Sequence, residues 1–144
     1  MKILVDADAC PVKEIIVRIA KQNRLPVIMF IDTSHEIHDG YSSVITVDKA
    51  RDSVDIALAN QIKPGDIVVT QDYGVAAMTL GKRALAINQN GLVYTNENID
   101  RLLFERHLAQ KVRRAGGRTG NTKKRMKEDD QSFEQAFRRL ILKE

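Results

Sequence analysis

The stretch KILVDADACPVKEII, residues 2–16, places a short apolar segment directly in front of two carboxylates. Residues 3–5 are apolar and largely β-branched, which is typical of a buried β-strand. After Asp6 and Asp8, Pro11 stands where the first turn of a helix tolerates proline. Apolar residues then recur at helical spacing. A buried strand that leads through two acids into a helix begins a βαβ unit, and this pattern predicts an α/β fold.

The alternation of strands and helices continues as far as about residue 110. Further segments of strand type lie at residues 27–31, 43–47, 66–70, 84–87 and 92–95. Helices are predicted at residues 12–20, 52–62 and 96–110, and a short helix that ends at residue 80 is predicted after residues 71–74. Strands that alternate with helices at this spacing pair mainly in parallel, with helices on both faces of the sheet. We therefore expect a three-layer α/β fold.

A chain of 144 residues is most simply one domain, residues 1–144. Its predicted parts are an α/β body at residues 1–110, a basic loop at residues 111–130 and a helix at residues 131–144. Ser132 and Gln135 form a capping-box pattern at the start of that helix. Its apolar face comprises Phe133, Ala136, Phe137, Leu140 and Ile141. Such a face must dock on the body, so the basic loop is tethered at both ends.

Charge is distributed unevenly along the chain. Residues 1–110 hold 12 Lys and Arg against 14 Asp and Glu, whereas residues 111–144 hold 11 against 5. Residues 111–127 carry eight basic residues and no acid. Such a block suits a polyanion, and nucleic acid is the expected partner. A solvated, disordered tail is the alternative interpretation.

Composition excludes several classes of protein. One cysteine makes neither an internal disulfide nor a cysteine-rich zinc site. The apolar segments are too short to span a bilayer, and residues 1–5 do not form the apolar core of a signal peptide. We expect a cytoplasmic protein with no membrane partner.

Acidic residues gather where the predicted strands end. Asp6 and Asp8 follow the first strand, Asp72 follows the strand at residues 66–70, and Asp52 and Asp55 open the helix after the third strand. The carboxyl ends of parallel strands meet at one edge of the sheet, where sites in open α/β sheets form. Carboxylates gathered there repel one another unless a cation neutralises them. Mg²⁺ and Mn²⁺ prefer such oxygen ligands, so the pattern predicts a site for one of these ions.

Helix capping offers a simpler explanation for some of these acids. Asp52 could be an N-cap with Asp55 in the first turn, and Asp8 could cap the helix that Pro11 opens. Asp6 and Asp72 directly follow apolar strands and are not expected to cap helices. Cys10, at a helix start, has either a lowered thiol pKa suited to a nucleophile or a packing role, which we favour.

Three motifs carry a resemblance to a known family. They are VDADACPVK at residues 5–13, DIVVTQDYGVA at residues 66–76, and the tail RAGGRTGNTKKR (114–125) with DDQSFEQAF (129–137). These stretches resemble the YaiI/YqxD family of uncharacterised bacterial proteins over essentially the whole chain. That family in turn resembles PIN-like (NYN-related) nuclease domains, which are metal-dependent phosphodiesterases.

The resemblance implies a PIN-like fold and a Mg²⁺- or Mn²⁺-dependent nuclease that acts on RNA rather than DNA. Asp6, Asp55 and Asp72 match the acids of the PIN-like pattern and would be catalytic metal ligands. PIN domains carry a further acid in mid-chain, for which Asp8 and Asp52 are the candidates. The basic segment would bind the nucleic-acid backbone through Lys111, Arg113, Arg114, Arg118, Lys123, Lys124, Arg125 and Lys127.

Two other functions fit the sequence. Haloacid-dehalogenase-like phosphatases also carry Asp-x-Asp after a first strand, and in such an enzyme Asp6 would be the nucleophile and Asp8 the general acid. A non-catalytic RNA-binding module that retains the acids is the third possibility.

Overall fold

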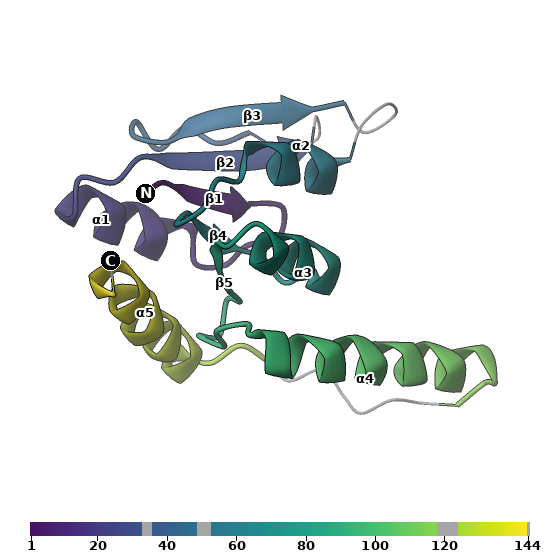
Figure 1. Ribbon diagram of the computed structural model, residues 1–144. Helices are drawn as coiled ribbons and strands as arrows, with labels where there is room; N and C mark the ends of the chain where they lie inside the picture. The colour runs from purple at the N-terminus through teal and green to yellow at the C-terminus, as the bar shows by residue number, and fades with distance from the viewer. Residues whose placement is uncertain (33–35, 49–52, 118–123, 144) are drawn as a thin grey trace.

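The computed structural model describes residues 1–32, 36–48, 53–117 and 124–143. Strands and helices alternate along most of the chain (Figure 1). The strands are β1 (Ile3–Asp6), β2 (Val27–Asp32), β3 (Ser43–Val47), β4 (Ile67–Val69) and β5 (Leu85–Ile87). The helices are α1 (Lys13–Gln22), α2 (Val54–Gln61), α3 (Tyr73–Gly81), α4 (Asn96–Arg114) and α5 (Lys127–Leu142).

All five strands are parallel and lie in the order β3-β2-β1-β4-β5. In β1, Ile3 is paired with Val27 of β2 on one side and with Ile67 of β4 on the other. The chain moves outward from β1 to β3 and then returns to the far side of β1 for β4. The strand order therefore reverses between β1 and β4, and a crevice forms beyond the carboxyl ends of these two strands.

Helices cover both faces of the sheet (Figure 1). Ile3 and Val5 of β1 face the cluster that contains α1 and α5. Leu4, which points to the opposite face, belongs to the cluster around α2. A third cluster joins α3, β5 and α4. The expected three-layer α/β fold is confirmed. Because side chains alternate along a strand, Asp6 lies on the same face of the sheet as Leu4, the face that α2 covers.

The C-terminal helix docks on α1, as its apolar face predicts. Phe133 and Phe137 are buried, and their rings stack at 5.2 Å between centroids. Arg18 of α1 donates a 2.7 Å hydrogen bond to Glu134 of α5 at the edge of this contact. The last helix of the chain is thereby fixed on the layer that contains α1.

The predicted ends of the last two helices were wrong. Helix α4 continues to Arg114 rather than ending at residue 110, and Gly116, with φ of 82°, follows its end. Basic side chains favour the last turn of a helix, where they interact with its dipole. Helix α5 begins at Lys127, because Asp129 accepts a hydrogen bond from the Met126 N–H. The expected capping box at residues 132–135 therefore lies inside the helix.

Three other boundaries differ from the prediction. Helix α1 begins at Lys13, and no side chain caps it, so Pro11 lies in the preceding turn and Asp8 is not its cap. Ser53 caps α2 by accepting from the Ile56 N–H. Asp52, the residue predicted as the N-cap, lies outside the described residues. The stretch at residues 92–95 makes an isolated antiparallel bridge instead of a strand.

Within the described ranges, no helix combines the length and the apolar character that crossing a membrane requires.

Candidate functional site

The crevice at the carboxyl ends of β1 and β4 is organised by Thr70, the first residue after β4. Its buried hydroxyl donates a 3.0 Å hydrogen bond to Oδ2 of Asp6, the last residue of β1. The Thr70 hydroxyl oxygen also accepts a 3.0 Å hydrogen bond from the backbone N–H of Asp72. The backbone carbonyl of Thr70 accepts from the hydroxyl of Tyr94 at 3.2 Å. Thr70 thus connects the ends of two neighbouring strands, β1 and β4, with the start of α3.

Asp72 has a structural role that the sequence prediction missed. It is the N-cap of α3, and its Oδ1 accepts hydrogen bonds from the N–H groups of Gly74 and Val75 at 2.8 and 3.2 Å. The prediction that Asp72 caps no helix was therefore wrong. Only one of its carboxylate oxygens serves as the cap in these contacts, so its other oxygen can face a second group.

That second group is Asp55, in the first turn of α2. Burial raises the pKa of Asp55, and so do repulsion by Asp72 and a side-chain hydrogen bond between the two carboxyl groups. The two carboxyl groups therefore lie close enough to interact, and a cation between them would relieve their repulsion.

Asp6 is the most strongly perturbed acid of the group. Burial raises its pKa to about 6, against an ordinary value of 3.8. This value already includes a lowering by the hydrogen bond from Thr70 and a further raising by the charges of Asp55, Asp72 and Asp8. The structure therefore brings together four of the five predicted acids. The fifth, Asp52, lies outside the described residues.

Three of these acids line a cleft of about 670 Å³. Asp6, Asp8 and Asp72 lie at the strand ends, and helix α4 contributes residues that face them. The α4 residues that line the cleft are Leu102, Glu105, Arg106, Ala109 and Arg113. The remaining lining residues are Ala9, Gln71 and Tyr73. The cleft thus has an acidic end and a wall of mixed charge.

Most of that α4 wall was not predicted from the sequence. Arg113 was expected to bind nucleic acid, but as part of a loop, and Glu105 and Arg106 were not singled out. A signal was present, because residues 102, 106, 109 and 113 recur at spacings of three and four and share one helix face. The sequence does not reveal that this face lies opposite the strand ends, since α4 is placed there by its packing on α3.

The predicted nucleic-acid-binding residues are distributed over two helices and the segment before α5. Lys111, Arg113 and Arg114 are exposed in the last turns of α4. Lys124 is exposed, and Lys127 is the first residue of α5. The structure does not describe Arg118 and Lys123. Of the described basic residues in this segment, Arg113 is the one that lines the cleft.

Arg125 belongs to the fold rather than to a free basic surface. Its guanidinium donates hydrogen bonds to Asp130 at 2.9 Å, to the Asn90 side chain at 2.6 Å and to the Gln89 carbonyl at 2.8 Å. The Gln89 side chain in turn accepts from the amide of Gln71, which lines the cleft. Arg125 therefore connects the start of α5 with the loop beside the acids.

Cys10 lies close to the acids but is suited to packing. It is 7% exposed, and burial raises the pKa of its thiol. A thiol with a raised pKa remains protonated at neutral pH and is a weak nucleophile.

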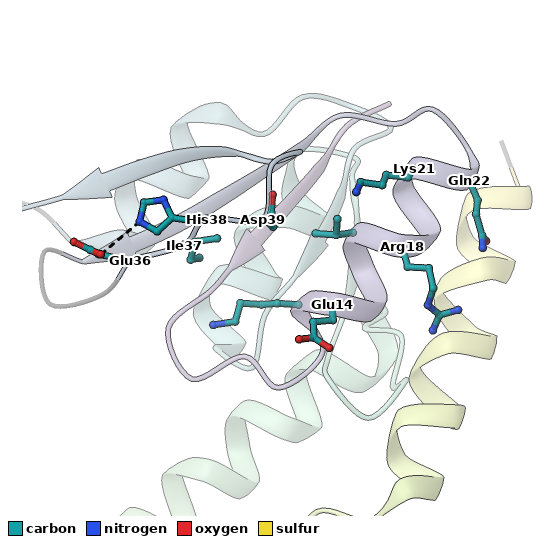
Figure 2. Close-up of a pocket in the computed structure, with 10 residues that line it drawn as sticks. Glu14, Arg18, Lys21, Gln22, Glu36, Ile37, His38 and Asp39 are labelled. Carbon is teal, nitrogen blue, oxygen red and sulfur yellow. Dashed lines mark hydrogen bonds and ion pairs between the residues drawn. The ribbon is translucent and has the colours of Figure 1, made fainter.

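A second large cavity, of about 530 Å³, lies away from the acids, between α1 and residues 36–39 (Figure 2). Its charged lining is balanced, with Lys13, Arg18, Lys21, Glu14, Glu36 and Asp39. Arg18 is already paired with Glu134, and His38 lies 3.4 Å from Glu36. This balance does not favour a polyanion, so the cleft at the strand ends is the candidate site.

The donor set of the cleft suits a hard cation. In the part of the chain that the structure describes, no three His, Cys, Asp or Glu side chains are arranged to hold one metal ion between them. Mg²⁺ usually takes one or two carboxylates and completes its shell with water. The carboxyl groups of Asp55 and Asp72 would supply those two ligands. They repel each other, and a cation bound between them would relieve that repulsion.

Sequence comparisons place the chain among bacterial proteins. The family model described as "Uncharacterized BCR, YaiI/YqxD family" matches residues 4–143. The UPF0178 protein of Ruminiclostridium cellulolyticum is 72% identical over 95% of this chain and 90% of its own length. That of Lachnoclostridium phytofermentans is 58% identical over 98% of this chain and 97% of its own. No solved structure matches the chain. The chain belongs to the YaiI/YqxD family.

Proposed function

We propose that the protein is a cytoplasmic nuclease that hydrolyses phosphodiester bonds of RNA with the help of Mg²⁺ or Mn²⁺. The observation that carries the proposal is the convergence of four carboxylates at the carboxyl ends of β1 and β4. Asp6, Asp8 and Asp72 line one cleft, and Asp55 contacts Asp72. The PIN-like resemblance of the motifs points to the same chemistry.

Asp72 is assigned to direct contact with the cation, with Asp55 or Asp6 as a second ligand. The remaining one of these acids and Asp8 would contact water bound to the cation. When bound, a divalent cation lowers the pKa of water and stabilises the oxygens of an in-line displacement at phosphorus. Thr70 keeps Asp6 and the start of α3 at a fixed separation, so the carboxylates need little rearrangement.

The α4 wall and the segment before α5 supply the positive charge that the acidic strand ends lack. Such contacts to phosphates give affinity without reading sequence. The choice of RNA over DNA as the substrate rests on the family resemblance alone, so both nucleic acids are tested as substrates.

The direct test is cleavage of a fluorescently labelled RNA and of a DNA of the same sequence. We expect the wild-type protein to cleave the RNA with Mn²⁺ or Mg²⁺ and not with EDTA. Asp72→Asn and Asp55→Asn should reduce the rate at least about 100-fold, since each removes a proposed ligand. Asp100→Asn, which removes an exposed acid on α4 outside the cleft, is the matched control and should cleave like wild type.

Two outcomes would contradict the proposal. One is the absence of metal-dependent cleavage of either nucleic acid. The other is equal cleavage by wild type and Asp72→Asn, which would identify a contaminating nuclease. Metal-dependent hydrolysis of a phosphate monoester, with a fluoride-metal adduct trapped on Asp6, would instead favour the phosphatase.

A further inference from the structure

The acidic end of the cleft poses an electrostatic problem for any nucleic-acid substrate. Asp6, Asp8 and Asp72, together with Glu105 on the facing helix, surround the space with negative charge. A phosphate backbone is repelled by such a surface, and a cation at the acids neutralises only the phosphate beside it. The phosphates on either side need their own positive partners.

Two arginines of α4 lie where they could contact these neighbouring phosphates. Arg106 and Arg113 line the same cleft as the acids, and they lie on one face of the helix with Leu102 and Ala109. Ala109, which has a small side chain, lies between them on that face and also lines the cleft. Seven residues of α-helix span about 10 Å, so the two arginines stand two turns apart along the wall.

Both guanidinium groups are available to a ligand. Among the described residues, neither Arg106 nor Arg113 forms an ion pair or a side-chain hydrogen bond. Neighbouring arginines differ: Arg101 lies 3.7 Å from Glu105, and Arg125 is engaged with Asp130. Planar guanidinium groups bind phosphate oxygens in a bidentate manner, which makes arginine well suited to gripping a phosphate.

We propose that Arg106 and Arg113 form a phosphate clamp, in which each binds a different backbone phosphate of one nucleic-acid strand in the cleft. This inference rests on the proposed function, because that function makes nucleic acid the ligand and places the reacting phosphate at the acids. The two arginines, however, bind their phosphates whether or not a cation is present. The cleft volume of about 670 Å³ is enough for a short length of one strand. The clamp therefore requires a chain of several nucleotides and does not serve a mononucleotide.

The test is the salt dependence of binding to a labelled single-stranded 12-nucleotide RNA in EDTA, measured by fluorescence anisotropy. Each phosphate contact on a single strand contributes about 0.7 to the slope of log affinity against log salt. Arg106→Ala and Arg113→Ala should each reduce the slope by about 0.7, and the double variant by about 1.4. Arg139→Ala is the matched control, because it removes the same charge from an exposed position of α5 that neither lines the cleft nor belongs to the predicted nucleic-acid-binding residues. Its slope should equal that of wild type.

The results separate the clamp from the proposed activity. Equal slopes for wild type, Arg106→Ala and Arg113→Ala, or the same loss in Arg139→Ala, overturn the clamp even if wild type cleaves the RNA with Mn²⁺. No measurable wild-type binding overturns it as well. The expected loss of slope supports the clamp even if no cleavage is found, and in that case it is the nuclease assignment that fails.

Discussion

Asp55 in the first turn of α2 and Asp72 at the N-cap of α3 come from different helices, yet their carboxyl groups contact each other. Burial and this contact raise the pKa of Asp55. Two acids in this arrangement are costly to the metal-free fold, and the cost is the physical signature of the site. The first prediction measures this cost.

Substitutions of Asp72 separate its two roles. Asparagine keeps the oxygen that caps α3 and removes the charge that repels Asp55. In EDTA, Asp72→Asn should therefore be at least as stable as wild type, and we expect its free energy of unfolding to be about 0.5–2 kcal/mol higher. Asp72→Ala also loses the cap and should be about 1 kcal/mol less stable than Asp72→Asn. Urea unfolding of the three proteins measures both differences. If Asp72→Asn proves less stable than wild type in EDTA, repulsion is not the dominant effect at this position.

The raised pKa of Asp6 predicts a pH dependence. The unfolded chain ionises this group near 3.8, whereas the folded protein holds the proton to about pH 6. Between these values the folded state binds more protons, so the free energy of unfolding should fall as pH rises. The full cost, up to about 3 kcal/mol, is present above pH 6 and absent below pH 3.8.

Asp6→Asn removes this titration. In EDTA it should gain stability over wild type at about pH 8 and show no gain at about pH 3.5. Asp100→Asn, an exposed acid of α4, provides the reference for general charge effects. An equal gain at both pH values would mean that Asp6 ionises normally in the folded protein.

The acids at the strand ends could be predicted from the sequence because they follow short apolar segments. This pattern is local and needs no knowledge of tertiary packing. Strand alternation does not place Asp8, because β1 ends at Asp6 and Asp8 lies in the turn that follows. Asp72 as a cap was missed because the helix begins at Tyr73, immediately after it, among residues without a strong helical periodicity. The ends of α4 and α5 were missed because the basic residues 111–114 and the acid at position 129 fit either a helix or a loop.

The α4 wall could not be predicted, because it depends on tertiary packing. The sequence shows that residues 102, 106, 109 and 113 share a face, but the cluster of α3, β5 and α4 decides what that face opposes. Arg125 was misjudged for the same reason. A basic residue in a basic stretch looks solvent-facing, whereas its partners Gln89 and Asn90 come from a distant loop.

Arg125 should therefore contribute to stability. Arg125→Ala removes the ion pair with Asp130 and the hydrogen bonds to Asn90 and Gln89, and should lower the free energy of unfolding by about 1–3 kcal/mol. Lys124→Ala removes the same charge from the exposed neighbour and should have little effect. Thermal melts of the two variants decide this. Equal melting temperatures would show that the contacts of Arg125 contribute nothing.

Cys10 should be dispensable for catalysis. Its buried thiol, with a raised pKa, packs beside the strand ends, so Cys10→Ser should keep metal-dependent hydrolysis and lose only a little stability. Initial cleavage rates and circular dichroism of the same sample check both parts. A folded Cys10→Ser protein without activity would require a thiol mechanism.

The most direct test of the metal site is an anomalous difference map from a crystal soaked in Mn²⁺, collected beside a crystal grown in EDTA. We expect an anomalous peak within coordination distance of the Asp72 carboxylate, with Asp6 or Asp55 as a second ligand and water in the remaining positions. A Mn²⁺-soaked crystal with well-ordered Asp6, Asp55 and Asp72 side chains and no peak among them would contradict the account.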